Sequence, residues 1–595
     1  MFRPLTRPLA AVVFAVAIVL ACGGDEPTNA AEKPAGIETE AVATELPAGA
    51  RVVVSGHDLA SFWSRLQGTR LYTEVTAVRD VQELKSEAQA AELCVEPDEA
   101  TVMNLLGEDF DLGYYGQREN DEPDLLLVAE VEDEARVREI VERCEQQLVE
   151  EKGATFRDEE YAGESIRVGT SDEGEAVLFY RLGDDRLTIA TTRTRIQQAI
   201  DLEQDDAAEA MVDVEAYDEL VEKLSDATIV AYVDQEALRL QAREAMPDTL
   251  AAEDQRQRRL AAATSLIDEL RLADATVVGI YWVESGIRGD AFGRFPEEGE
   301  RSELVKLLAK EPGEIRTLGF QPVGTLLYGA ITTLDAELLY DELYRYAIEA
   351  TRVQMDVANT PDSARADSVV AAQLEAFESR TGIDVEEEVV AWIGEEAAFA
   401  ITGVDKTGFF PIPEVAFTIG TTDPQTTRTF FTELEGTVAE MARAQASIPL
   451  QWQEEQYEGR TIRYAPTPMG EGLSVAYTVG EEFAVLASSR GLVKRMLDAR
   501  AGRAEALPAN PDFAAMTEFY PQRVSTLGFV NLEGILTEVE GLMGSLGQMG
   551  GQASAADTTD TARQLIAALK NAPRLGVYSE SSGSGVTGHF LLEVN

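Results

Sequence analysis

The chain has 595 residues, of which 45% are hydrophobic, so it is long enough to bury more than one core. Acidic residues outnumber basic residues by 107 to 50, and the formal net charge at pH 7 is -57. A field of this sign repels nucleic acid and anionic lipid, so we expect no nucleic-acid partner.

The N-terminus predicts an exported, lipid-anchored protein. Arg3 and Arg7 precede an apolar run over 9–20 that is too short for an ordinary transmembrane helix. The run ends in Val19-Leu20-Ala21-Cys22, which resembles the bacterial lipobox. The resemblance implies a signal peptide over residues 1–21, cleavage before Cys22, and acyl chains on that cysteine that hold the protein to a membrane. An ordinary secretory signal with a chance cysteine is the alternative.

Residues 22–46 predict a flexible tether, because they are rich in Gly, Pro, Ala, Thr and Glu without an apolar period. Gly23, rather than Asp, follows the lipidated cysteine. By analogy with lipoprotein sorting, this favours the outer membrane if the organism has two membranes.

The remaining cysteines are Cys94 and Cys144. An exported protein folds in an oxidising compartment, where a disulfide between them is expected. The loop of about 50 residues that it closes would contribute up to about 4 kcal/mol. Two free thiols on separate helices are the alternative.

The first half of the body predicts alternating strands and helices. Strands are expected at 51–55, 110–116, 124–131, in four short segments before 191, and at 227–233, 276–283 and 287–295. Helices are expected after Asp58, which we assign as a cap, and at 98–106, 133–151, 192–202, after Asp234, and at 250–272.

The second half predicts the same order of elements. Strands are expected at 324–331, 397–403, 414–420, in further segments before 487, and at 524–530, 574–579 and 586–594. Helices are expected at 334–355, 423–446, 491–500, 532–543 and 564–570, with a break at 359–363 and a mobile loop over 544–559.

A repeated motif suggests that this order arose by duplication. Tyr161-Ala-Gly-Glu-Ser-Ile-Arg167 is echoed by Tyr457-Glu-Gly-Arg-Thr-Ile-Arg463, and each predicts a tight Gly turn that leads into a strand. Further matches, such as Asp133 with Asp423, keep a nearly constant spacing. The predicted fold is α+β, with two tandem homologous domains at 47–310 and 311–595. Each is expected to be a mainly antiparallel sheet with helices packed on one face.

A family resemblance follows from motifs in both halves. Leu46-Pro-Ala-Gly precedes a Val-rich strand and Asp58-Leu59, and a segment around Asp384 leads to Val390-Ala-Trp392-Ile-Gly394. This pattern is similar to the bacterial DUF3352 proteins over residues 46–595. The resemblance implies an exported or membrane-attached protein of unknown function and brings no catalytic residues with it.

The sequence lacks the parts for several common chemistries. It contains two histidines, His57 and His589, each expected at a surface or an edge, so imidazole metal sites and Ser–His catalysis are nearly excluded. We expect no metal and no cofactor. The acid pairs Asp109/Asp111 and Asp205/Asp206 could serve a hydrolase, but in so acidic a chain such pairs arise from composition alone.

Two apolar segments are candidates for contact with a partner. Phe409 and Phe410 stand beside prolines in an insertion found only in the second half, and 543–549 is rich in Gly and Met. Packing of the two phenylalanines between the halves is the alternative.

These patterns predict a non-enzymatic binding or scaffolding protein of the cell envelope. Its expected partners are the membrane, through the acyl anchor, and an unknown envelope protein or ligand. A carboxylate-based envelope hydrolase and a carrier of lipids or small molecules are the alternatives.

Overall fold

The structure is a computed structural model. It describes residues 45–78, 105–118, 122–172, 176–183, 185–204, 208–224, 226–244, 272–357, 365–406, 411–446, 450–466, 474–549 and 556–595.

The described chain alternates between strands and helices. The strands are β1 (Val52–Gly56), β2 (Phe110–Gln117), β3 (Pro123–Glu130), β4 (Thr155–Tyr161), β5 (Glu164–Thr170), β6 (Ala176–Leu182), β7 (Arg186–Ala190), β8 (Ile229–Asp234), β9 (Ala275–Val283), β10 (Gly286–Arg294), β11 (Leu327–Ile331), β12 (Ile393–Asp405), β13 (Ile412–Thr421), β14 (Gln453–Tyr457), β15 (Arg460–Tyr464), β16 (Ala476–Val479), β17 (Phe483–Ala487), β18 (Thr526–Asn531), β19 (Arg574–Ser581) and β20 (Gly585–Glu593). The α-helices are α2 (Leu59–Gln67), α3 (Arg70–Thr76), α6 (Glu134–Lys152), α7 (Arg193–Gln204), α8 (Glu215–Val221), α9 (Gln235–Glu244), α11 (Glu303–Leu308), α12 (Ala336–Val357), α13 (Ala366–Thr381), α14 (Pro424–Ala446), α15 (Arg490–Arg500), α16 (Pro511–Ala515), α17 (Leu532–Met549) and α18 (Ala556–Leu569).

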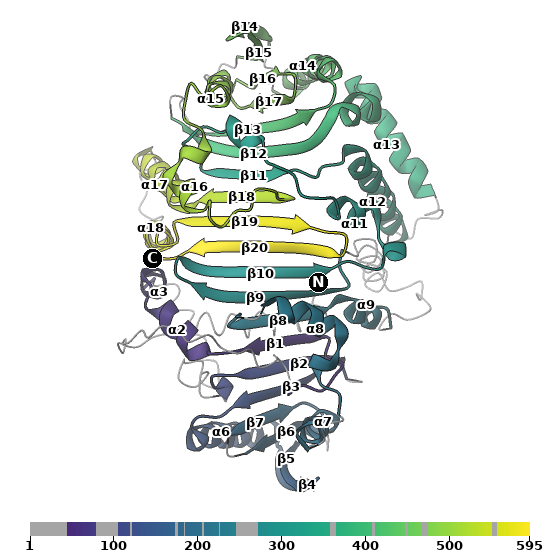
Figure 1. Cartoon of the computed structure of the whole chain (residues 1–595), viewed down its shortest axis with the longest axis vertical. Coiled ribbons are helices and arrows are strands. Elements are labelled where there is room, and N and C mark those ends of the chain that lie inside the picture. Colours follow the sequence, from purple (N-terminus) through teal and green to yellow (C-terminus); the bar gives the residue numbers. More distant parts are fainter. Residues whose placement is uncertain are drawn as a thin grey trace.

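All of these strands belong to one 20-stranded antiparallel sheet (Figure 1). The pairings run from one edge to the other in the order β4-β5-β6-β7-β3-β2-β1-β8-β9-β10-β20-β19-β18-β11-β12-β13-β17-β16-β15-β14. The predicted α+β class with a mainly antiparallel sheet is therefore confirmed.

The two halves of the sheet have the same strand order. Strands β11 to β20 pair with one another as β1 to β10 do, and β10 joins β20 at the middle of the sheet. We expected each half to have its own sheet, but this antiparallel pairing, from Gly286↔Glu593 to Arg294↔Gly585, makes the sheet continuous. The common order is what a duplication requires, while the common ancestry stays a prediction.

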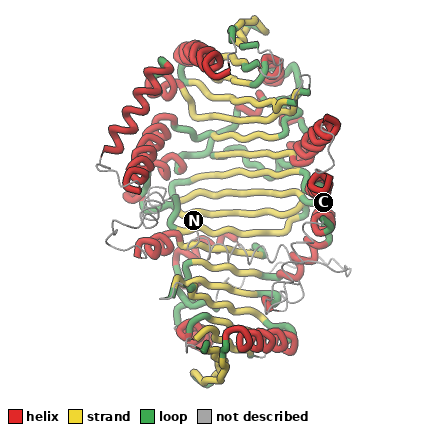
Figure 2. The backbone as a smooth tube through the Cα atoms, turned by 180° about the vertical axis from the view of Figure 1, so that it is seen from behind, coloured by secondary structure: helices red, strands yellow, loops and turns green. Residues whose placement is uncertain are grey.

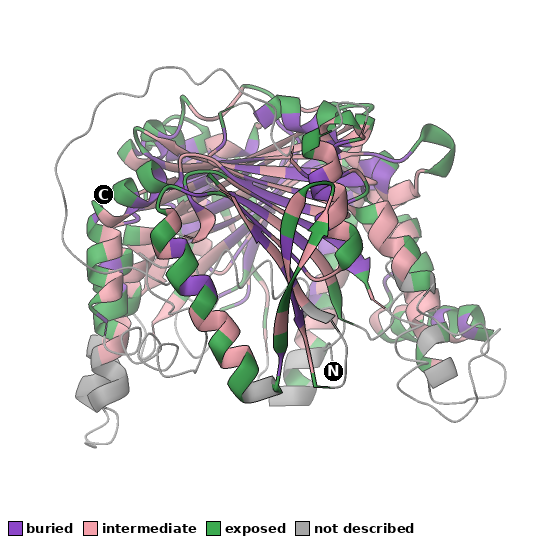
Figure 3. Ribbon diagram, turned by 90° about the horizontal axis from the view of Figure 1, so that it is seen from below, coloured by how far each residue is buried: buried purple, intermediate pink, exposed green. Residues whose placement is uncertain are grey.

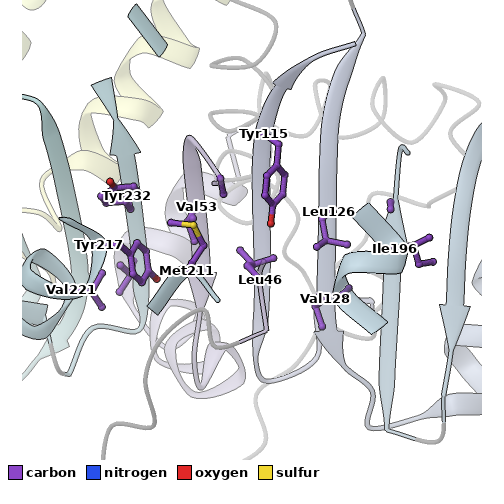
Figure 4. Close-up of a cluster of buried hydrophobic side chains, with 14 of the residues drawn as sticks. Leu46, Val53, Tyr115, Leu126, Val128, Ile196, Met211, Tyr217, Val221 and Tyr232 are labelled. Atoms are coloured by element: carbon purple, nitrogen blue, oxygen red, sulfur yellow. The ribbon is translucent and has the colours of Figure 1, made fainter. Parts of the chain in front are cut away.

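One face of the sheet carries the main core. We call it the covered face. In the first half, α7 and α8 pack against this face, and Tyr217 of α8 meets Tyr232 of β8 edge to face at 5.1 Å. Phe513 of α16 and Phe529 of β18 make the equivalent contact in the second half at 5.2 Å. Figure 4 labels part of this core: Leu46, Val53, Tyr115, Leu126, Val128, Ile196, Met211, Tyr217, Val221 and Tyr232.

Helices also pack on the opposite face, most extensively at the two ends of the sheet. Val137 and Val141 of α6 contact Leu187 of β7. Phe431 of α14 packs on Tyr477 of β16 with ring centroids 4.6 Å apart. The prediction that helices pack on one face was therefore too simple.

The repeated motif forms the same turn in each half. Ala162 and Gly163 have φ of 53° and 91°, and Glu458 and Gly459 have φ of 50° and 77°. Two successive residues with positive φ are typical of the tight turns that join antiparallel strands, which here link β4 to β5 and β14 to β15. The glycine is required because a side chain resists this conformation.

Helix caps were predicted with mixed success. Asp133, Asp234 and Asp423 accept hydrogen bonds from the first-turn amides of α6, α9 and α14, as expected. Asp58 does not cap α2 with its side chain, because its own backbone has a φ of 49°. The predicted mobile loop over 544–559 was also wrong in part, since α17 continues to Met549 and α18 begins at Ala556.

Candidate binding surface

Most of the residues predicted to form sites lie outside the described part of the chain. These are Cys22, Cys94, Phe409 and Phe410. Cys144, on α6, is disulfide-bonded. Its pairing with Cys94 remains a prediction, because the partner is not described.

A large, mainly apolar surface lies on the side of the sheet opposite the main core. We call it the open face: the residues of β8, β9, β10, β20, β19, β18, β11, β12 and β13 that point away from the covered face. The strand registers place them in cross-strand rows, because directly opposed residues share a face. Its larger apolar members are Ile229, Val233, Val278, Ile280, Trp282, Ile287, Phe590, Leu592, Leu575, Val577, Val530, Leu327, Ile331, Phe399, Ile401, Val415, Phe417 and Ile419.

In β8, β11, β12 and β18 the open-face side chains are half-exposed, whereas their sequence neighbours on the covered face are buried. In β8, Val230 and Tyr232 are 1% exposed, while Ile229, Ala231 and Val233 are intermediate. Val577 and Phe417 reach 37% and 43% exposure. These strands are apolar on both faces, a pattern typical of strands that are covered on both sides.

Side chains on the open face pack sideways into glycine positions. One row runs through Phe590, Val577, Gly528, Gly329 and Phe399 on neighbouring strands. A Cβ atom on Gly528 would lie 2.5 Å from the Val577 side chain, so a larger residue at that position would require Val577 to shift. This packing makes the surface a broad apolar floor.

The described helices flank the open face without crossing its middle. Figure 2 shows the central strands from this side with no described helix across them. The helices α3, α17 and α18 stand along one set of strand ends, and α9, α12 and α13 along the other (Figure 1). Figure 3 shows that the long flanking helices project on the same side of the sheet, so the floor lies between two helical walls.

The base of one predicted contact segment lies beside the helix that contains the other, at one of these walls. Lys406, which precedes the undescribed loop with the two phenylalanines, forms an ion pair at 2.7 Å with Glu538 of α17. Residues 543–549, the second predicted segment, belong to the same helix. The base of the β12–β13 loop therefore lies beside α17 at the border of the open face.

A group of polar side chains lies on the covered face at the seam, which is the junction where β10 of the first half pairs with β20 of the second. His589 Nδ1 lies 2.6 Å from Asp290 on the neighbouring strand, and Arg288 donates to the same carboxylate at 3.0 Å. His589 also stacks on Tyr578 at 4.5 Å. Burial alone would raise the pKa of Asp290, but the hydrogen bonds from His589 and Arg288 outweigh it and lower the pKa. We expected a surface or edge histidine here, whereas the His589 side chain is only 10% exposed and lies on a central strand.

His57 lies at the start of α2 and has an acidic partner too. Its Nδ1 is 3.3 Å from Asp109, and this hydrogen bond raises the pKa of His57 and lowers that of Asp109. The His57 Nε2 is buried without a hydrogen-bond partner in the described part of the chain. No described serine therefore forms the hydrogen bond to His57 that Ser–His catalysis requires. Asp111 is engaged separately by the Ser55 hydroxyl. The predicted pair Asp109/Asp111 is thus divided between two structural contacts, and Asp205/Asp206 lies outside the described residues.

A matching ionic cluster secures the end helix of each half. Arg167 donates through Nε and a terminal nitrogen to Glu145 of α6 at 2.8 and 3.0 Å, and Tyr180 donates to the same carboxylate. Burial would raise the pKa of Glu145, but the hydrogen bonds from Arg167 and Tyr180 lower it.

The second copy of this cluster joins Glu435 of α14 to Arg463 and Tyr477. Arg463 donates at 2.7 and 2.6 Å, and Tyr477 donates at 2.7 Å. The residues of both clusters hold a helix to the sheet, which is a structural role. Both arginines belong to the repeated motif, but no pattern in the sequence identifies their acidic and tyrosine partners.

Residues 99–541, well over half of the chain, match the family model described as a protein of unknown function, DUF3352. The chain belongs to the DUF3352 family. Neither a curated protein nor a solved structure gives a significant match. Within the described part of this DUF3352 protein, no helix is long and apolar enough to cross a membrane, and no group of His, Cys, Asp and Glu is placed to hold a metal ion.

Proposed function

We propose that the protein is a non-enzymatic binding protein of the cell envelope, held to a membrane through Cys22, and that its binding surface is the open face. The observation that carries the binding role is an extended, half-exposed sheet face whose paired cross-strand rows from β8 to β13 hold no charged residue, in a chain with 26% charged residues. Apolar surfaces of this kind mark sites of contact with a partner or ligand. The location rests on the lipobox and the tether.

The hydrolase alternative has no support from a described cluster. The carboxylates closest to catalytic chemistry, Asp109 and Asp290, are each bound by a histidine. A general acid or base must reach the substrate, and these groups have structural partners instead. Turnover by the purified protein in a broad hydrolase screen would overturn the non-enzymatic part of the proposal.

Two experiments test the remaining parts. For the anchor, Cys22→Ala should move the protein from the membrane fraction to the soluble fraction, and persistent membrane association would contradict it. For the surface, the mature chain from residue 22 carrying Cys22→Ala should be treated with an apolar carbene photolabel. Labelling should concentrate on β19 and β20 rather than on the acidic strand β4. Equal labelling of these strands would show that the open face is not accessible.

A further inference from the structure

The chemistry of the open face limits what can bind to it. Its few polar members include Thr526 and Ser579, whose hydroxyls bond to each other at 2.6 Å. The backbone groups of the central strands are used in the sheet ladder. A typical protein interface supplies about one hydrogen bond per 100–200 Å². This surface offers few hydrogen-bond donors or acceptors, so it suits a ligand that binds through apolar contacts alone.

The flanking helices limit the shape of the occupant. They project beyond the sheet on the side of the open face and stand at both sets of strand ends (Figure 3). Each wall carries exposed apolar side chains, including Leu343 on α12 at 59% and Leu565 on α18 at 39%. A flat partner, such as the open face of a second copy, would meet these walls before it reached the floor. A slender chain can lie between them.

Charge limits the occupant further. A second copy of the protein carries the same net charge of -57 and is repelled. The same field disfavours a ligand with an anionic headgroup. An amphiphile with a neutral or zwitterionic headgroup avoids this repulsion, while burial of its hydrocarbon chain away from water favours binding.

We infer that the open face binds the acyl chains of a lipid with a neutral or zwitterionic headgroup. The inference rests on the proposed function and specifies its ligand. The chains lie on the floor formed by residues such as Phe590, Val577 and Phe399, between the two walls, and the headgroup remains in water. Acyl chains satisfy all three limits, because they are apolar, slender and without hydrogen-bonding groups along their length.

Trp282 provides a direct readout, because it lies on the open face at β9, where its ring meets Phe62 edge to face at 5.8 Å. The probe is lysophosphatidylcholine with a nitroxide on its acyl chain, added below its micelle concentration to the mature chain with Cys22→Ala. That substitution removes the protein's own acyl anchor as a competitor. We expect saturable quenching of tryptophan fluorescence, most of which is lost in Trp282→Phe.

A matched pair of variants locates the site. Val577→Glu places a carboxylate on the floor and should weaken binding at least tenfold, because the charge must lose water when a chain covers it. Val149→Glu on α6 changes an equally apolar residue, 46% exposed, outside the open face and should bind like the parent. Binding by the anionic analogue lysophosphatidylglycerol should be weaker at low salt, and added salt should narrow the difference.

Several results would overturn the inference. If carbene labelling shows an accessible open face but the lysolipid does not quench Trp282, the surface binds a different partner. Binding of an apolar peptide, or dimerisation that depends on protein concentration, would then show which partner occupies it. In that case the proposed binding function survives. If the face is neither labelled nor quenched, other parts of the chain cover it, and both proposals fail. Equal binding by Val577→Glu and Val149→Glu would place the lipid elsewhere.

Discussion

The sharpest stability prediction concerns Glu435, which secures α14 to the sheet. Its side chain is 9% exposed and receives both arms of Arg463, which is 30% exposed, together with the Tyr477 hydroxyl. Glu435→Gln preserves the shape but removes the charge, so Arg463 loses its bidentate partner. Hydrogen bonds to charged groups contribute about 1.5–3 kcal/mol each, and breaking a buried pair costs about 3–5 kcal/mol.

The exposure of Arg463 reduces that cost, because the guanidinium can turn toward water and toward Glu454, which lies 3.4 Å away. We therefore expect Glu435→Gln to lower the free energy of α14 opening by about 2–3 kcal/mol. Hydrogen exchange of α14 amides measures this quantity directly. Urea unfolding followed by fluorescence gives a second measure, because Trp452 donates to the backbone carbonyl of Glu435 at 3.0 Å.

The chain offers two controls for this measurement. Glu454→Gln changes the exposed acid on the same arginine, and we expect an effect within about 0.5 kcal/mol. Glu145→Gln changes the equivalent residue of the first half, which is 15% exposed beside an arginine that is 32% exposed. Its effect should be smaller, about 1–2 kcal/mol, and confined to α6. The reasoning is refuted if Glu435→Gln and Glu454→Gln destabilise α14 equally.

Three further predictions concern titration and redox state. In NMR titrations the pKa of His57 should lie above its ordinary value of 6.5, and Asp109→Asn should bring it down; a normal value in the parent would disprove the contact. The folded pKa of Asp290 is lowered from 3.8, so its stabilising effect exists above that value and is lost as the pH falls through the folded pKa. The protection factors of β10 amides, which correct for the pH dependence of intrinsic exchange, should therefore fall in acid, and Asp290→Asn should remove this dependence. Non-reducing peptide mapping of the exported protein should find Cys94 joined to Cys144, and mapping of Cys144 to any other partner would refute the predicted pairing.

The parts of the fold that sequence analysis predicted well are local. The turn at Gly163 and its counterpart at Gly459 needed only a glycine in the left-handed region, and both turns form. Asp133 and Asp423 begin helices because an Asp side chain reaches the amides of its own first turn. Such features depend on neighbours within a few residues, so the sequence contains them in full.

The seam could not be predicted because it joins residues from opposite ends of the body. Asp290 and His589 are partners only because β10 and β20 pair in one particular register. The sequence around each of these strands predicts a hairpin at the end of its own half. No residue near either strand indicates that the two hairpins pair with each other and join the two halves into one sheet.

The open face was missed for a different reason. Strands such as β9 alternate Val277, which is fully buried, with Val278, which is half-exposed, and both are apolar. An apolar residue on each face predicts cover on each face. Which face is left without cover depends on where the helices dock, and α8 docks on the covered face while the long helices stand at the strand ends.

The seam and the charged sheet edges together explain how the sheet can carry so wide an apolar floor without pairing with the sheets of other copies. An exposed edge strand is a template for further pairing. Each half uses one edge, β10 or β20, to extend the other, and the remaining edges are β4 and β14. Strand β4 reads Thr-Phe-Arg-Asp-Glu-Glu-Tyr and β14 reads Gln-Glu-Glu-Gln-Tyr, so both outer edges are acidic. Two copies brought edge to edge would oppose like charges, which stops growth at one molecule. The strands with an apolar open face are thereby confined to the centre, where they form a single floor between the helical walls.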